Sequence, residues 1–146
     1  MKATFRQIEH TADVAIEAEA PDLPGLFDRA AAGMFSLMTE GAPPRPREEH
    51  RVAVEGADLP ELLVAFLREL AWLHAERGFL YAGARCERLD AEPVGPAPAR
   101  LVARVAGEAA DPARHAVVRE IKAVTYHALA VERRGDGWFA RVVFDV

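Results

Sequence analysis

The sequence has little of what marks a secreted, disulfide-bonded or membrane-spanning protein. Its only cysteine is Cys86, which excludes an internal disulfide and a zinc site built from several cysteines. No apolar run approaches the roughly 20 residues of a transmembrane helix. Arg6, Glu9 and His10 lie where a signal peptide would have its apolar segment. We therefore expect a cytoplasmic protein that makes no membrane contact.

A basic stripe and the common catalytic motifs are also missing. The 146 residues carry a formal net charge of −5, and Lys and Arg are not concentrated in any one segment. A protein that grips phosphate backbones normally shows such a stripe, so we do not expect strong direct binding of nucleic acid. The sequence has no Gly-rich phosphate loop, no G-x-S-x-G and no H-E-x-x-H motif. The usual signatures of an enzyme are therefore absent.

What is present is a mixture of strand and helix patterns over a length that suits one domain, residues 1–146. Alternating apolar and polar residues predict strands near 12–20, 51–55, 82–89 and 100–106. Apolar residues at helical spacing follow Asp22 and Asp58, which suit N-cap positions, and Gly78 ends the second of these patterns.

The last third of the sequence predicts a β-hairpin. Two β-rich runs, 123–134 and 138–146, flank a Gly-Asp-Gly turn signal. Counting outward from the turn gives four pairs: Arg133 with Trp138, Val131 with Ala140, His127 with Phe144, and Thr125 with Val146. The hairpin then returns Lys122, Thr125 and His127 to the level of Asp145. With two helices and no regular βαβ alternation, we expect an α+β fold with a mainly antiparallel, barrel-like sheet.

The end of the sequence places two anions side by side, the carboxylate of Asp145 and the α-carboxylate of Val146. Like charges this close repel each other, so the arrangement is costly unless a cation or a donor such as Lys122 neutralises it. Carboxylates prefer hard cations such as calcium, magnesium and manganese. The alternative is a solvated terminus with a surface aspartate.

A second polar cluster lies in the segment EHTADV, which holds Glu9, His10, Thr11 and Asp13 ahead of a predicted strand. Asp13 suits a metal ligand or a general base, and His10 suits a ligand or a proton shuttle. The alternative is that these residues form a turn and bond the nearby backbone. Their spacing does not choose between the two.

A third cluster is REIKAVTYH, where Glu120 and Lys122 share one face of an extended segment and Thr125 and His127 share another. The alternative here is a solvated Glu/Lys edge that runs into a core strand.

Four segments, in order, resemble the archease family: HTADV, the helix LFDRAAAGMFSLM, EIKAVTYHAL and the terminal FDV. The resemblance covers both ends and the first helix well, the second helix less closely, and residues 78–115 hardly at all. It implies an accessory protein, not itself a catalyst, that activates the RtcB-type RNA ligase. That ligase joins RNA ends in tRNA splicing and RNA repair, and the resemblance implies that its guanylylation and its multiple turnover are promoted.

The resemblance also implies roles for individual residues. Asp13, Asp145 and the terminal carboxylate of Val146 would hold a divalent metal ion, with calcium preferred over manganese or magnesium. The residues themselves suggest that Lys122 pairs with a carboxylate or reaches a phosphate or an acidic residue on the ligase, and that His10 and His127 orient the site.

Two other functions fit the sequence. One is a small metal-dependent phosphoester hydrolase with Asp13 or His10 as base and the ion as Lewis acid. The other is a general chaperone-like binding module that does not use the acidic cluster.

Overall fold

The described chain folds as two compact units. The structure is a computed structural model that describes residues 1–9 and 13–146. Unit 1 comprises Met1–Ala42 and Ala110–Val146, and unit 2 comprises Pro43–Ala109. Each unit has its own helix and its own antiparallel sheet. The expectation of a single domain over 1–146 stays a prediction.

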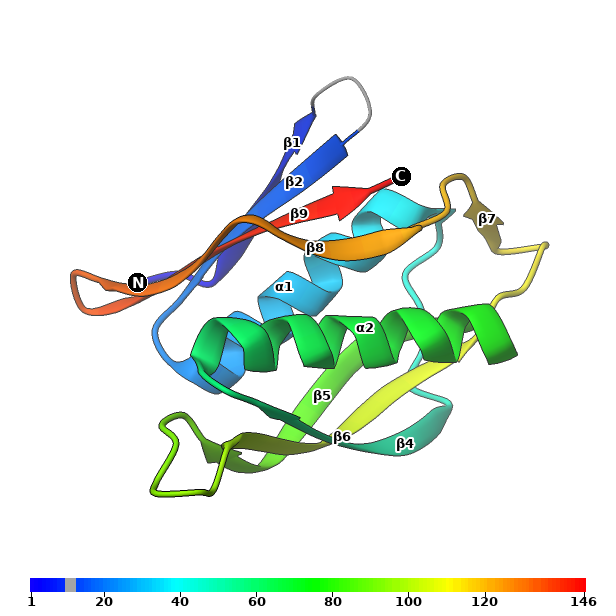
Figure 1. Cartoon of the computed structure of the whole chain (residues 1–146). Coiled ribbons are helices and arrows are strands. Elements are labelled where there is room, and N and C mark those ends of the chain that lie inside the picture. The colour runs from blue at the N-terminus through cyan, green and yellow to red at the C-terminus, as the bar shows by residue number, and fades with distance from the viewer. Residues whose placement is uncertain (10–12) are drawn as a thin grey trace. The chain divides into compact units, whose positions relative to one another are not determined.

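Unit 1 is built on a four-stranded antiparallel sheet with strand order β1-β2-β9-β8. Its strands are β1 (Thr4–Glu9), β2 (Asp13–Ala20), β8 (Ala123–Arg134) and β9 (Gly137–Asp145). Two short strands, β3 (Thr39–Gly41) and β7 (His115–Val117), pair in a separate sheet. Figure 1 shows β9 between β2 and β8, so segments from the two ends of the sequence lie side by side.

Helix α1 (Leu23–Met38) packs on one face of this sheet. The Asp22 side chain accepts a hydrogen bond from the Gly25 N–H at 2.8 Å, as expected for an N-cap. Val14 and Ile16 on β2 are buried. The contact is close, because a Cβ added at Gly33 would lie 2.9 Å from the Ile16 side chain. This face of the sheet is the core of unit 1, and the other face carries the polar residues of β2.

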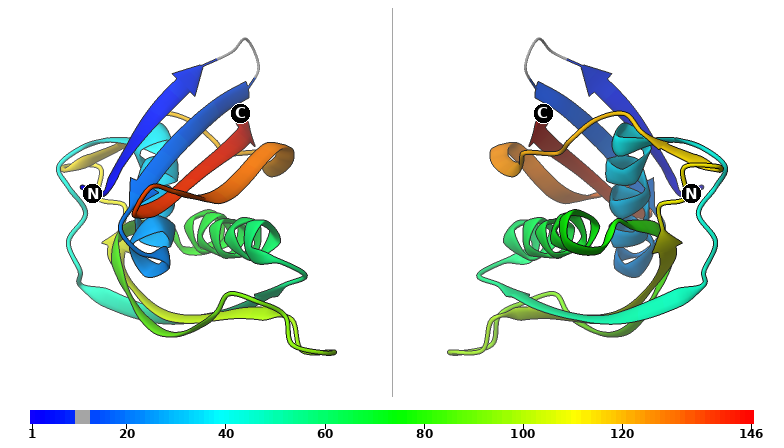
Figure 2. Two further views of the ribbon diagram at one scale, coloured as in Figure 1. Left: turned by 90° about the vertical axis from the view of Figure 1, so that its left-hand side faces the viewer. Right: turned by 90° about the vertical axis from the view of Figure 1, so that its right-hand side faces the viewer.

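Unit 2 places one helix on a three-stranded antiparallel sheet with strand order β4-β6-β5. Its elements are β4 (Glu48–Gly56), α2 (Leu59–Arg77), β5 (Phe79–Asp90) and β6 (Ala99–Ala109). Asp58 accepts from the Glu61 N–H at 2.9 Å, and Gly78 ends the helix with a left-handed φ of 67°. Both predicted helix boundaries are therefore confirmed. Figure 2 shows α2 along one face of this sheet.

The expected fold class is confirmed, but the barrel-like sheet is wrong. The described strands form three separate sheets, and these sheets do not close into a barrel. In unit 2 the curvature comes with two register shifts in the β5–β6 pair, one between Tyr81 and Gly83 and one between Cys86 and Arg88. In the part of the chain that the structure describes, neither helix is long and apolar enough to cross a membrane.

Candidate functional site

The site begins where β2 starts and β9 ends. Asp13 is the first residue of β2 and Asp145 is the last residue of β9, and the two are directly opposite each other in the antiparallel pairing. Opposite residues of such a pair point to the same face of the sheet with Cβ atoms about 5 Å apart. Two carboxylates from the two ends of the sequence therefore share one face. Figures 1 and 2 show the start of β2 beside the end of β9. Asp13 is half-buried and Asp145 is exposed.

Lys122 reaches the same edge from the other side of β9. Its backbone N–H donates to the backbone oxygen of Asp145 at 2.8 Å, and the next residue, Ala123, is opposite Asp145. The Lys122 side chain is exposed. The predicted return of Lys122 to the level of Asp145 is confirmed. An ammonium group on this flexible stem could neutralise a carboxylate here or reach a partner.

The predicted register of the hairpin holds near the turn and fails further along. Arg133 is opposite Trp138 and Val131 is opposite Ala140, as expected. Beyond Ala130 a β-bulge intervenes, in which residues 126–129 of β8 face the single residue Val142 of β9. Two predicted pairs are consequently wrong: Val124, not His127, is opposite Phe144, and Thr125 is opposite Val143, not Val146.

The side chain of Thr125 and a left-handed alanine shape the bulge. The Thr125 hydroxyl donates to the Val143 backbone oxygen at 2.9 Å and accepts from the His127 N–H at 3.3 Å. Ala128 has a φ of 50°, a conformation that costs a residue with a Cβ about 1–2 kcal/mol. The bulge changes the direction of the His127 side chain, which therefore lines the site. The alternation of residues along the strand does not predict this.

A hollow of about 270 Å³ opens on this face of the sheet. It is lined by Asp13 and Ala15 of β2, Arg141 and Val143 of β9, and His127 of the bulge. Asp13 puts an anion at one end and Arg141 puts a cation further along the same strands. Because Arg141 is paired with Glu17, the charge that the hollow offers to a ligand is the carboxylate of Asp13.

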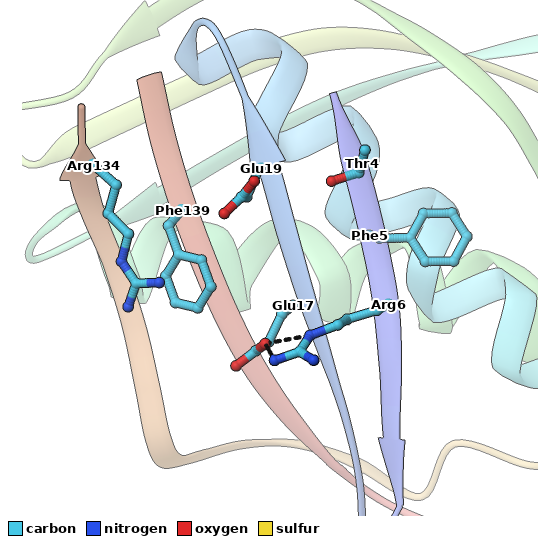
Figure 3. Close-up of a pocket in the computed structure, with 7 residues that line it drawn as sticks. All are labelled: Thr4, Phe5, Arg6, Glu17, Glu19, Arg134 and Phe139. Carbon is cyan, nitrogen blue, oxygen red and sulfur yellow. Dashed lines mark hydrogen bonds and ion pairs between the residues drawn. The ribbon is translucent and has the colours of Figure 1, made fainter. Parts of the chain in front are cut away.

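Arg141 is held in place by a carboxylate. Glu17 is opposite Arg141, and its side chain accepts hydrogen bonds from Arg141 at 3.1 Å and from Arg6 of β1 at 2.6 Å. The Glu17 side chain is only 15 % exposed. Burial alone would raise the pKa of Glu17, but the two arginines outweigh it and hold this pKa below its ordinary value. Figure 3 shows the Arg6–Glu17 contact in the next hollow along the sheet, beside Glu19 and Phe139.

Comparison with known proteins gives the same result in sequence and in structure. The sequence model of the Archease protein family matches residues 5–146 of this chain. The chain is 37 % identical to "Protein archease" of Thermococcus gammatolerans, over 97 % of this chain and 98 % of that one. It is 39 % identical to "Protein archease" of Methanopyrus kandleri, over 97 % and 99 % of the two chains. The chain belongs to the archease family.

A solved structure supports the archease fold. The solution structure of Methanobacterium thermoautotrophicum protein 1598 aligns with a TM-score of 0.80 at 29 % identity, covering 97 % of this chain and 98 % of that one. The archease match also runs through residues 78–115, where the sequence alone showed hardly any resemblance.

The residues that an archease is expected to use are partly placed by the structure. Asp13, Asp145 and Lys122 meet at one edge, and His127 lines the adjoining hollow. Val146 follows Asp145 directly and is half-buried. His10 lies outside the described residues.

The donor chemistry at this edge suits a hard divalent cation. Asp13 and Asp145 have no ion pair with any residue that the structure describes. Among those residues no three His, Cys, Asp or Glu side chains are grouped for a metal ion. The carboxylate of Val146 would be the third donor, and calcium takes six to eight oxygen ligands, so water would supply the remainder. The metal-binding role of these residues stays a prediction.

Glu17 and Arg141 were not predicted from the sequence. The signal was present, because Asp13 and Glu17 are four residues apart on one strand, and so are Arg141 and Asp145. Residues an even number apart on a strand share a face. Given the pairing of Asp13 with Asp145, Glu17 and Arg141 follow.

Proposed function

We propose that this protein is a non-catalytic cytoplasmic accessory factor that activates an RtcB-type RNA ligase in tRNA splicing and RNA repair. In this proposal it promotes guanylylation and multiple turnover of the ligase through a divalent metal site where β2 begins and β9 ends. Membership of the archease family supports the class of function. The observation that supports the site is the pairing of Asp13 with Asp145 next to Lys122.

The edge has the charges that such a role requires. Two carboxylates on one face repel each other, and a divalent cation between them would turn this repulsion into attraction. Asp13, Asp145 and the Val146 carboxylate would hold the ion, with calcium as first choice and manganese or magnesium as alternatives. When bound, the ion would supply positive charge for phosphate oxygens of a guanylyl donor or for acidic groups on the ligase.

Lys122 and His127 would act around that centre. Lys122 is exposed and tied to Asp145 through the backbone, so its ammonium group can reach a phosphate or a carboxylate on the ligase. His127 is exposed on the bulge and shares the hollow with Asp13, where it can donate a hydrogen bond to a bound group. The rigid pairing of β2 and β9 fixes the two aspartates, because they are held by the sheet and not by a loop.

The experiment measures guanylylation of an RtcB-type ligase with labelled GTP, with and without this protein. Asp145→Asn and Asp13→Asn should each abolish the stimulation, because either change removes one of the metal-binding charges. Asp136→Asn is the matched control. Asp136 is an exposed aspartate in the turn at the opposite end of the same hairpin, so this variant should stimulate fully.

Two further variants test the terminus and the lysine. Adding one residue after Val146 moves the α-carboxylate away from Asp145 and should reduce the stimulation at least tenfold. Lys122→Met should do the same, whereas Lys2→Met, at the only other lysine in the sequence, should have no effect. Full stimulation by Asp145→Asn would refute the proposed site.

The same preparation tests the two alternative functions. A metal-dependent phosphoester hydrolase would turn over a substrate such as p-nitrophenyl phosphate without the ligase and would lose that activity in Asp13→Asn. A general chaperone-like module would stimulate equally well as Asp13→Asn and would also protect unrelated clients.

A further inference from the structure

Unit 2 carries a row of three arginines across the open face of its sheet. Arg51 on β4 is opposite Arg104 on β6, and Arg104 is opposite Arg85 on β5. Residues opposite each other across antiparallel strands point to the same face. Neighbouring strands are about 4.8 Å apart, so the row spans about 10 Å.

The row lies on the face that α2 leaves uncovered. Leu101, Ala103 and Val105 alternate with the arginines along β6 and are 2 %, 2 % and 0 % exposed, which marks their face as the one that α2 covers. Arg51 and Arg85 are exposed, and the side chain of Arg104 is 41 % exposed.

Most of the other charges on this face are paired. Three arginines form ion pairs with carboxylates: Arg104 with Glu87 at 2.9 Å, Arg100 with Glu55 at 2.6 Å, and Arg88 with Asp90 at 2.7 Å. Arg51 and Arg85 have no such pair with any residue that the structure describes. They are the two ends of the row.

This arrangement is costly for the protein alone. Like charges directly opposite each other destabilise a sheet pair. The row contains two such pairs and one neutralising carboxylate. An anion that bridges the guanidinium groups would offset the repulsion, and guanidinium groups bind phosphate oxygens in a bidentate manner.

The surface beside the row contains a hollow in which an extended polymer chain can lie. A hollow of about 450 Å³ is lined by Arg51, Arg100, Ala53 and Val102, among others. Ala53 and Val102 are opposite each other in the row next to the arginines, so short side chains separate the arginine row from the Glu55–Arg100 pair. No aromatic residue lines this hollow, so stacking of bases is not part of the recognition.

We propose that the Arg51–Arg104–Arg85 row binds the phosphodiester backbone of an RNA strand without reading its sequence. The choice of RNA as the polyanion rests on the proposed function, in which the partner enzyme acts on RNA. The binding is weak and salt-dependent because it uses few phosphate contacts. It is therefore compatible with the net charge of −5, which excludes only a strongly basic surface.

The test measures binding of a fluorescein-labelled 20-nucleotide oligouridylate by the full-length protein alone, using fluorescence anisotropy at several salt concentrations. Three phosphate contacts predict a slope of about −2 for log affinity against log salt, which is a roughly 18-fold loss of affinity between 50 and 200 mM salt. The double variant Arg51→Gln/Arg85→Gln should lower the slope to about −0.7 and the affinity at low salt at least tenfold.

The matched control is Arg88→Gln/Arg100→Gln, which removes the same charge from the same face at arginines that are already ion-paired. It should lower the affinity less than threefold. Equal losses in the two double variants would show that net charge alone acts and would overturn the proposal. Binding of poly-glutamate in place of RNA, or no binding by the wild type, would overturn it as well.

Thermal unfolding supplies an independent readout. Arg51→Gln should raise the melting temperature by about 1–3 °C, because it relieves repulsion within the row. A melting temperature several degrees lower would mean that the row stabilises the sheet without a bound anion, and this would overturn the proposal. Because the ligase is absent from both assays, their failure leaves the proposed activation of the ligase untouched, and the reverse also holds.

Discussion

Glu17 links Arg6 of β1 to Arg141 of β9, and replacing it by glutamine tests how this face of the four-stranded sheet is held together. The change keeps the shape but removes the charge and one of the two acceptor oxygens, so Arg6 and Arg141 lose their shared carboxylate. The two pairs differ in exposure. Arg6 is 72 % exposed, which places its contribution in the range of about 0.2–1 kcal/mol for surface pairs. Arg141 is 26 % exposed, and its bond to Glu17 contributes about 1.5 kcal/mol.

Together these contributions predict that Glu17→Gln lowers the free energy of unfolding by about 2 kcal/mol at pH 7. For a chain of this length that corresponds to a melting temperature lower by about 6 °C. The assay is thermal unfolding followed by circular dichroism. Glu19→Gln is the matched control, because Glu19 is on the same strand and face and has no ion pair with the residues that are described. It should change the melting temperature by less than about 1 °C.

The dependence on pH gives the sharper test. Arg6 and Arg141 hold the pKa of Glu17 below its ordinary value of 4.5 against the effect of burial. A carboxylate with a lowered pKa stabilises the fold above its unfolded pKa, and this contribution disappears as pH falls through the folded pKa. The difference between wild type and Glu17→Gln should therefore be constant from pH 8 to pH 6 and shrink below pH 4.5. Equal melting temperatures at pH 7, or a difference that persists in acid, would show that the two arginines do not stabilise the fold through the charge of Glu17.

Three further outcomes are expected, the first from the proposed metal site and the other two from the described geometry. Calcium should raise the melting temperature of the wild type and of Asp136→Asn but not that of Asp145→Asn, measured by differential scanning fluorimetry against an EDTA reference; a rise in Asp145→Asn would place the ion elsewhere. Ala128→Gly should increase the free energy of unfolding by about 0.5–1 kcal/mol in denaturant titration, because the φ of 50° suits glycine, and a decrease would contradict this. Gly107→Ala should cost more than about 3 kcal/mol, because the new Cβ would lie 2.0 Å from a backbone oxygen, whereas Gly83→Ala meets nothing within 4 Å and should be nearly neutral in the same titration.

The parts of the fold that were predictable are those that local chemistry determines. Asp22 and Asp58 cap their helices because an aspartate side chain can accept the free N–H groups of a first turn. Gly78 ends α2 because glycine adopts positive φ without strain. The hairpin turn is similarly local, and the pairs next to it were correct.

The parts that were missed depend on other strands. Alternation along β8 gives no sign of the bulge, which forms through the Thr125 hydroxyl and the backbone of β9. The prediction of a barrel-like sheet was wrong because the residue pattern of a strand does not show which other strands it pairs with. The arginine row was invisible for the same reason: Arg51, Arg85 and Arg104 are far apart in sequence, and only the pairing of three strands assembles them.

The insertion of unit 2 between the two halves of unit 1 has a consequence for synthesis on the ribosome. Pro43–Ala109 is continuous in sequence, so unit 2 can fold as it leaves the exit tunnel. Strand β2 cannot pair with β9 until more than a hundred further residues have been synthesised. Until β9 emerges, the inner edge of β2 offers unpaired backbone groups to other chains. A nascent or prematurely terminated product therefore lacks the paired aspartates, and only a chain synthesised through Asp145 contains the candidate site.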